Sequence, residues 1–197
     1  MLGKRTLQAR FPAFQSPKTV TPIPVRHSAV QDALIQSSLD PQVQSIGYVA
    51  SAVVASQQVN LGAIVIQRDD GRFFLDVVPA RRVLDLDQLG LALIALEELR
   101  LKRCTINADE LLREPRCSNA RFVWLYKDYP VPHKLRDRIL RALIGKKSVA
   151  LGELERSVRV RSVRDPSNAV MSLVCADVLE LDLTSQAIQL TTRVRAR

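Results

Sequence analysis

The alternation of hydrophobic and polar positions predicts one helix and three strands between residues 28 and 78. From Ser28 apolar residues recur at helical spacing until Asp40-Pro41 closes the segment, and Ser28 is the expected N-cap. Three β-rich segments follow, at residues 45–54, 59–67 and 72–78. Residues 68–71 read RDDG between the last two, and Asp-Gly between apolar runs is a strong hairpin signal. We therefore expect a strand hairpin in this region.

A second group of elements is predicted between residues 86 and 126. Residues 86–101 have leucines at helical spacing with Asp85 or Asp87 as the cap, and residues 103–106 form a short strand. A small helix begins at Asn107 and ends at Pro115, and another helix covers residues 118–126. The order helix, three strands, helix, strand is that of an α/β domain in which helices cover a sheet.

The pattern changes after Pro130 and Pro132. Helices are predicted over residues 134–144, 151–158 and 166–179, followed by a strand over residues 188–194. Three compact helices and a terminal β-ribbon indicate a winged helix-turn-helix. The expected organisation is thus an irregular basic arm at residues 1–27, an α/β domain at 28–128 and a winged helix at 129–197. Phe11 and Phe14 in the arm could dock on the domain or on a partner.

Composition limits the class of protein. The chain has 197 residues, 47% hydrophobic and 25% charged, which is typical of a packed soluble protein. No segment has the apolar length of a membrane span, and no apolar run follows the basic residues at the N-terminus as a secretory signal would require. Three cysteines without metal-ligand spacing favour a reducing cytoplasm over a zinc site or a disulfide scaffold.

The uneven distribution of charge points to a polyanionic partner. The formal net charge is +9. Residues 1–28 carry +5, residues 29–130 carry −2, and residues 131–197 carry +6 from 13 basic and seven acidic side chains. Arginine dominates the C-terminal excess and is suited to bidentate phosphate contacts, which favours nucleic acid.

Two stretches carry a resemblance to a known family. Residues 105–116 read TINADELLREPR, residues 118–121 read SNAR, residues 125–126 read LY, and residues 72–82 read RFFLDVVPARR. In these runs the chain resembles the TnsA-like transposon endonucleases over about residues 28–190. The resemblance implies a restriction-endonuclease-like PD-(D/E)XK core followed by a C-terminal winged helix.

The resemblance also implies a set of catalytic positions, and this chain departs from it. Such nucleases hold a divalent metal with acidic side chains and place a lysine beside them. The corresponding positions here are Gln31, Gly62, Asp76 and Val78, so that one carboxylate remains and the lysine is missing. The expectation is a nuclease fold that has lost its active site, with no catalytic residue, no bound metal and no cofactor.

A different alignment of the strand that contains Asp76 would be compatible with nuclease activity. Asp69 and Asp70 are adjacent carboxylates near Asp76, and Arg81 or Arg82 could replace the lysine. Against this alternative, adjacent carboxylates in a hairpin turn are usually solvated residues that favour the turn. A divalent metal would be the cofactor only if this alternative holds.

The basic residues around the second and third C-terminal helices are the predicted DNA-binding site. Arginines would contact the phosphate backbone, while Ser167 and Asn168 in the first turn of the third helix would face base edges. The full predicted set is Lys146, Lys147, Arg156, Arg159, Arg161, Arg164, Ser167, Asn168, Arg193 and Arg195. The rest of that helix is apolar, which favours phosphate-dominated contact or partial use as a protein-docking module. Trp124 and Tyr126 could stack on bases, but a packing role is the stronger reading.

These observations favour a cytoplasmic protein that binds double-stranded DNA and acts as an accessory subunit in transposition, recombination or control of a mobile element. The first alternative is an active metal-dependent endonuclease of a transposon or phage. The second is a protein-docking module for a transposase. The sequence allows a homodimer.

Overall fold

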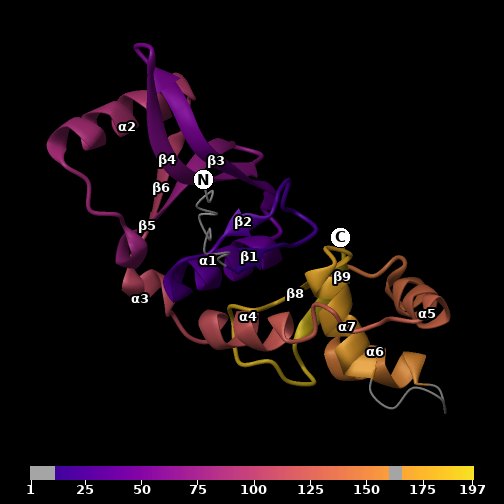
Figure 1. Cartoon of the computed structure of the whole chain (residues 1–197). Coiled ribbons are helices and arrows are strands. Elements are labelled where there is room, and N and C mark those ends of the chain that lie inside the picture. Colours follow the sequence, from indigo (N-terminus) through magenta and orange to yellow (C-terminus); the bar gives the residue numbers. More distant parts are fainter. Residues whose placement is uncertain (1–11, 160–165) are drawn as a thin grey trace, which may run out of the picture.

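A four-stranded mixed sheet forms the centre of the N-terminal half of the protein. The computed structural model describes residues 12–159 and 166–197 (Figure 1). The sheet has the order β3-β4-β5-β6, in which β5 and β6 are parallel and the other neighbours are antiparallel. Its elements are α1 (Ser28–Leu39), β3 (Val43–Val54), β4 (Gln57–Arg68), β5 (Gly71–Val77), the 3-10 turn η1 (Val78–Ala80), α2 (Leu86–Glu98) and β6 (Lys102–Ile106). The predicted α/β class and the predicted order of elements in this region are confirmed.

The two faces of the sheet follow from strand alternation. Ile64 and Ile66 on β4 and Leu75 and Val77 on β5 join the main core together with α1. Alternate residues point to the opposite face, which α2 covers through a smaller cluster around Ala95. The predicted hairpin between β4 and β5 is present, and Gly71 at its turn has a φ of +136°, a conformation that glycine adopts without strain.

Residues 12–27 belong to the packed structure rather than to a separate arm. The short strands β1 (Ala13–Phe14) and β2 (Ile23–Pro24) pair with each other, and Phe14, Ile23 and Val25 are buried in the main core. The prolines exclude regular structure between the strands but do not prevent burial of these three side chains. Phe11 lies outside the described residues. The cap of α1 also differs from the prediction, because His27 Nδ1, and not Ser28, accepts the Ala29 N–H at 3.1 Å.

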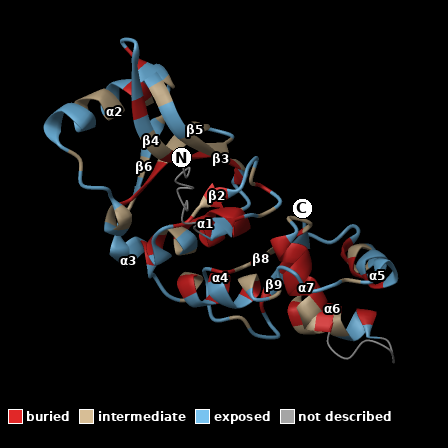
Figure 2. Ribbon diagram, viewed as in Figure 1, coloured by how far each residue is buried: buried red, intermediate tan, exposed pale blue. Residues whose placement is uncertain are grey.

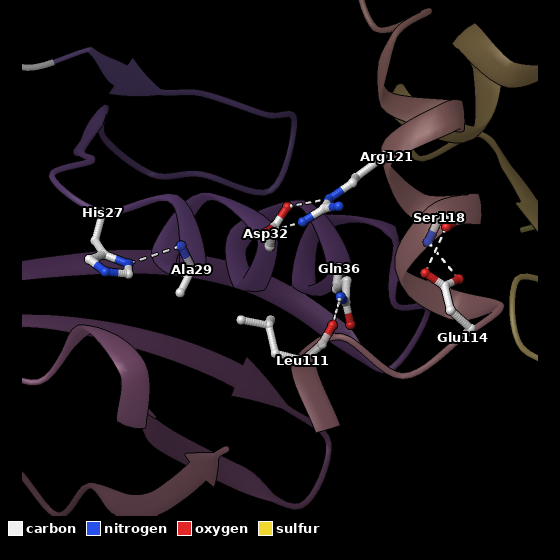
Figure 3. Close-up of polar contacts among 8 residues, drawn as sticks. All are labelled: His27, Ala29, Asp32, Gln36, Leu111, Glu114, Ser118 and Arg121. Carbon is white, nitrogen blue, oxygen red and sulfur yellow. Dashed lines mark hydrogen bonds and ion pairs between the residues drawn. The ribbon is translucent and has the colours of Figure 1, made fainter. Parts of the chain in front are cut away.

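Two short helices connect the sheet to the C-terminal half. α3 (Ala108–Leu111) begins with a capping box between Asn107 and Glu110, as the predicted helix start at Asn107 requires. α4 (Arg116–Trp124) packs beside α1, and polar contacts join α1 to both α3 and α4 (Figure 3). Arg121 donates two hydrogen bonds to Asp32, at 2.9 and 2.7 Å, and Gln36 donates to the backbone oxygen of Leu111 at 2.7 Å.

The C-terminal half consists of three helices and a small antiparallel sheet of order β7-β9-β8. Its elements are α5 (His133–Leu143), β7 (Val149–Ala150), α6 (Leu151–Val158), α7 (Pro166–Cys175), β8 (Leu179–Leu181) and β9 (Arg193–Ala196). Two predictions here are wrong. The third helix ends at Cys175 because Asp177 takes a φ of +62°, after which residues 179–181 form a strand. The predicted strand over residues 188–194 is instead β9, shifted towards the C-terminus.

Both halves share one apolar core, which crosses the predicted boundary at 128/129. Cys175 Sγ lies 3.3 Å from the Val123 oxygen, and Ser172 donates to the Tyr129 oxygen at 2.8 Å. Asn119 is buried and donates to the backbone of the loop that follows β8. The contacts of α7 with α4 and α1 are therefore part of the fold. None of the helices among the described residues has the length and apolarity needed to cross a membrane.

Candidate functional site

Asp76 on β5 is the one acidic side chain left from the catalytic set that the sequence suggested, and arginines occupy its oxygens. Arg81 Nε donates to Oδ1 at 2.8 Å and Arg81 Nη2 donates to Oδ2 at 2.6 Å. Arg103 on β6 lies 3.8 Å from Oδ2. Asp76 is 5% exposed and Arg81 is exposed, so the bidentate pair forms at the edge of the protein interior.

The electrostatics of this pair stabilise the ionised carboxylate without a metal. The hydrogen bonds from Arg81 lower the pKa of Asp76, with smaller contributions from the charges of Arg81 and Arg103 and from the Thr105 hydroxyl, while burial opposes the shift. In return, Asp76 raises the pKa of Arg81. One carboxylate faces two guanidinium groups, and the local charge is positive.

A divalent metal does not fit this donor set. Binding a cation would require displacement of Arg81, and hard cations need several oxygen ligands. No group of three or more potential metal-binding side chains occurs in the described part of the chain. The alternative ligands Asp69 and Asp70 are exposed in the β4–β5 turn, at the opposite end of β5 from Asp76, and Asp69 accepts a hydrogen bond from Gln44.

The other three positions of the suggested set are spread around the end of the sheet. Gly62 on β4 lines the same cleft as Asp76, together with Val30 from α1. Gln31 is exposed on α1, and Val78 lies in η1 just after β5. Neither Gln31 nor Val78 lines this cleft. The structure thus brings Gly62 and Asp76 together and leaves the other two outside.

Gly62 lies between two clefts. The first, which we call the arginine cleft, has a volume of about 710 Å³ and is lined by the polar side chains of Arg26, His27, Tyr48, Ser51, Gln58, Asn60 and Arg82. The second, which we call the apolar cleft, has a volume of about 580 Å³ and lies between α2 and the sheet. Asp76 and Arg81 line only the apolar cleft.

The basic residues predicted to bind DNA differ in how far their charges are already paired. Arg195 is paired with Glu180, Lys146 lies 3.8 Å from a Glu153 oxygen, and Arg156 donates to the carbonyl of Gly152 in its own helix. Lys147, Arg159 and Arg193 are exposed, and their side chains form no hydrogen bond or ion pair with the rest of the described chain. Arg161 and Arg164 lie outside the described residues. The unpaired group is the more accessible to phosphate.

The predicted base-reading residues have little free surface. α7 is buried along most of its length (Figure 2), and Ser167 and Asn168 at its start are half-buried. The Ser167 hydroxyl donates to the Glu155 carboxylate on α6. Their role in reading bases stays a prediction, and only the first turn of α7 has surface available for it.

The sequence analysis missed a basic stripe on α5. Lys134, Arg138 and Arg141 are exposed and recur at i, i+4 and i+7, opposite the buried Leu135 and Ile139. Their side chains also form no ion pair or hydrogen bond within the described residues. The signal was present, because this helix combines a regular apolar face with basic residues at helical spacing. We call this set the α5 stripe.

The aromatic residues in and just after α4 are engaged in packing. The rings of Trp124 and Phe14 stack with centroids 5.1 Å apart, and Tyr126 meets Phe122 edge-on at 5.5 Å. One face of the indole is therefore covered by the chain itself.

A comparison with models of known protein families finds no match, and a comparison with curated proteins finds none either.

Proposed function

We propose that the protein binds double-stranded DNA through its C-terminal half and does not cleave it. The observation that carries this proposal is the set of exposed, unpaired cations in residues 131–197. They are Lys134, Arg138 and Arg141 of the α5 stripe, together with Arg136, Lys147, Arg159 and Arg193. Unpaired cations can exchange counterions for phosphates without first losing a partner in the protein.

The topology of this half supports the proposal. The element order α5, β7, α6, α7, β8, β9 and the sheet order β7-β9-β8 agree with a winged helix. Because α7 is buried against α4 and α1, contact with DNA would come from α5, the turns and β9 rather than from a helix inserted in the groove. We expect phosphate-dominated binding with low sequence specificity.

The resemblance to the TnsA-like endonucleases supports a role beside an active enzyme. Asp76 bound by Arg81, with glycine at position 62, suits a nuclease-like domain that has lost its chemistry. We propose an accessory or regulatory subunit in transposition, recombination or control of a mobile element.

A plasmid assay tests the absence of cleavage. The full-length protein, incubated with supercoiled plasmid and Mg²⁺ or Mn²⁺, is expected to leave the plasmid intact over hours. Because Asp76 is the remaining carboxylate of the set, cleavage that disappears in Asp76→Ala would establish the nuclease alternative instead.

A binding assay tests the DNA interaction. Replacement of Lys134, Arg138 and Arg141 by alanine is expected to weaken binding to any duplex. It should also reduce the slope of log K against log salt by about one unit for each phosphate that is no longer neutralised. Arg195→Ala is the matched control, because Arg195 is already paired with Glu180. Equal weakening in the triple variant and in Arg195→Ala would contradict the assignment.

One observation favours a second function, docking on a protein such as a transposase. α2 exposes Leu86, Leu89, Leu93 and Ile94, and Val83 before it is fully exposed. An apolar surface of this kind is typical of an interaction site. A mobility shift that is absent at low salt would favour this function over DNA binding.

A further inference from the structure

The arginine cleft has the composition of a site for an anion. Among the described residues that line it are Arg26, Arg82 and His27, and none of its lining residues is acidic. Asp76, the one acid of the suggested catalytic set, lines the neighbouring apolar cleft, and its carboxylate accepts hydrogen bonds from Arg81. The volume of the arginine cleft, about 710 Å³, lies within the range of roughly 300–1,000 Å³ that is usual for small-molecule sites.

Gly62 leaves a space between two hydrogen-bond donors. A Cβ built on Gly62 would lie 3.5 Å from the Tyr48 hydroxyl oxygen and 3.8 Å from Arg82 Nη1. The Tyr48 hydroxyl and the Arg82 guanidinium therefore lie on either side of the space that a side chain at position 62 would fill. A carboxylate at this position would bind cations, whereas glycine leaves a phenol and a guanidinium facing the same space.

The donors around this space are available to a ligand. Arg82 is exposed and makes one hydrogen bond to a described residue, at 3.3 Å, to Oδ1 of Asn60, which is also exposed. His27 lies at the start of α1, where its Nδ1 accepts the Ala29 N–H (Figure 3). The neutral ring must then carry its proton on Nε2, so that His27 is a donor on its other side. Apolar walls from Val30, Ile64 and Ala80 complete the cleft.

We propose that the arginine cleft binds the phosphate group of a nucleotide without a metal ion, with Arg82, Tyr48 and His27 as donors. The phosphate could belong to a free nucleotide or to the end of a DNA strand, and both present the same charge and oxygens. Arginine is suited to this group because its planar guanidinium can donate two parallel hydrogen bonds to phosphate oxygens. This site is separate from the C-terminal surface of the proposed function and can fail or succeed independently.

Calorimetric titration of the full-length protein in EDTA tests the proposal. The probes are thymidine, thymidine 5′-monophosphate, and a short single-stranded oligothymidylate with and without a 5′-phosphate. We expect no binding of thymidine and saturable binding of the monophosphate. Tighter binding of the 5′-phosphorylated oligonucleotide than of the monophosphate would assign the ligand to a DNA end, and the reverse would assign it to a free nucleotide.

Two variants in the cleft and two controls outside it complete the experiment. Arg82→Ala is expected to weaken monophosphate binding about tenfold or more, since hydrogen bonds to charged groups are among the stronger ones. Asn60→Asp places a negative charge beside Arg82 with almost no change in shape and should have a similar effect. Arg72→Ala, an exposed residue at the other end of β5, and the triple variant of the α5 stripe should bind the monophosphate normally.

Absence of monophosphate binding by the wild-type protein would overturn the proposal. So would normal binding by both Arg82→Ala and Asn60→Asp, with thermal unfolding showing that the variants are folded. Loss of duplex binding in the α5 stripe variant with intact monophosphate binding separates the two sites. A requirement for Mg²⁺ would also contradict the metal-free site.

Discussion

At the scale of single residues, the arginines around Asp76 make the local charge positive. A set of carboxylates repels itself and attracts cations, whereas Asp76 here has Arg81 on both oxygens and Arg103 nearby. The role of this carboxylate is then structural: it anchors the chain that leaves β5 through η1.

Asp76→Ala is expected to lower the free energy of unfolding by about 1 kcal/mol or more at neutral pH, because the two charge-assisted hydrogen bonds from Arg81 to this buried carboxylate are removed. The lowered pKa of Asp76 means that its contribution is present above the ordinary carboxyl pKa and is lost as the pH falls through the lowered value. Urea titrations of the wild type and the variant at pH 7 and pH 3 should therefore differ less at pH 3. An equal difference at both values would contradict the ionised pair.

Lys18 is a second residue whose role sequence reasoning missed. It is 4% exposed, donates to the Asp40 oxygen at 2.6 Å and lies 3.3 Å from Asp177, and it thus joins residues 12–27 to both halves. Burial, and next the charge of Arg197, lower its pKa from 10.5 to about 8. A lysine within a Pro-rich stretch of basic sequence gives no sign that it will be buried.

The pKa of Lys18 predicts how stability depends on pH in the alkaline range. Between about pH 8 and pH 10.5 the unfolded chain binds more protons than the folded one, so the contribution of Lys18 to stability rises with pH. The free energy of unfolding of the wild type minus that of Lys18→Met is expected to rise by about 2 kcal/mol from pH 8 to pH 10. A constant or falling difference, measured by urea unfolding, would show that Lys18 stays charged in the folded protein.

At the scale of elements, α1 and α2 differ in how firmly they are packed against the rest of the protein, because they differ in burial. α1 has eight buried residues in its 12, while Ala95 is the buried residue of α2 (Figure 2). α2 is well capped by Asp85, but it rests on the sheet through a small separate cluster. Local capping forms the helix, and little tertiary packing holds it.

Hydrogen exchange should therefore separate these two helices. Amides of α2 are expected to exchange through local opening, much faster than those of α1, which should open only with global unfolding. Mass spectrometry of peptides from the two helices provides the measurement, with α7 as a second protected reference. Equal protection of α1 and α2 would mean that another molecule, such as a second copy, covers the apolar face of α2 in solution.

The elements were largely predictable from sequence where local signals agree. Local sequence is enough to predict an element where it contains the whole signal. Examples are the apolar periodicity of α1, α2 and α5, the Asp-Gly turn before β5 and the cap at Asn107. β8 was not predicted and β9 was placed too early in the chain, because short strands gain their stability from partners far along the chain. Likewise, the pair between Asp76 and Arg81 requires knowledge of how η1 turns back, which no local pattern contains.

At the scale of the whole molecule, the continuous core implies that the halves do not separate. The described core runs from Phe14 near the N-terminus to Val194 near the C-terminus. A cut after residue 130 would remove α7 and expose the sides of α1 and α4 that it covers. DNA binding should accordingly be assigned with point variants in the full chain.

We expect one cooperative unfolding transition for the full chain, because both halves share this core. Circular dichroism of the backbone and amide protection of α7 should report the same midpoint in urea. Two separate midpoints would support the independent domains that the sequence suggested at 28–128 and 129–197.

The stacking of Phe14 on Trp124 gives the protein a built-in optical reporter. Trp124 is the one tryptophan of the chain, and its emission therefore comes from a single place, where residues 12–27 meet α4. Detachment of that segment would expose the indole to water and shift its fluorescence to longer wavelength even if every helix stayed intact. Phe14→Ala should reproduce this red shift in the folded protein. A spectrometer can thus follow the docking of the N-terminal segment in real time, including during titration with DNA, without any attached dye.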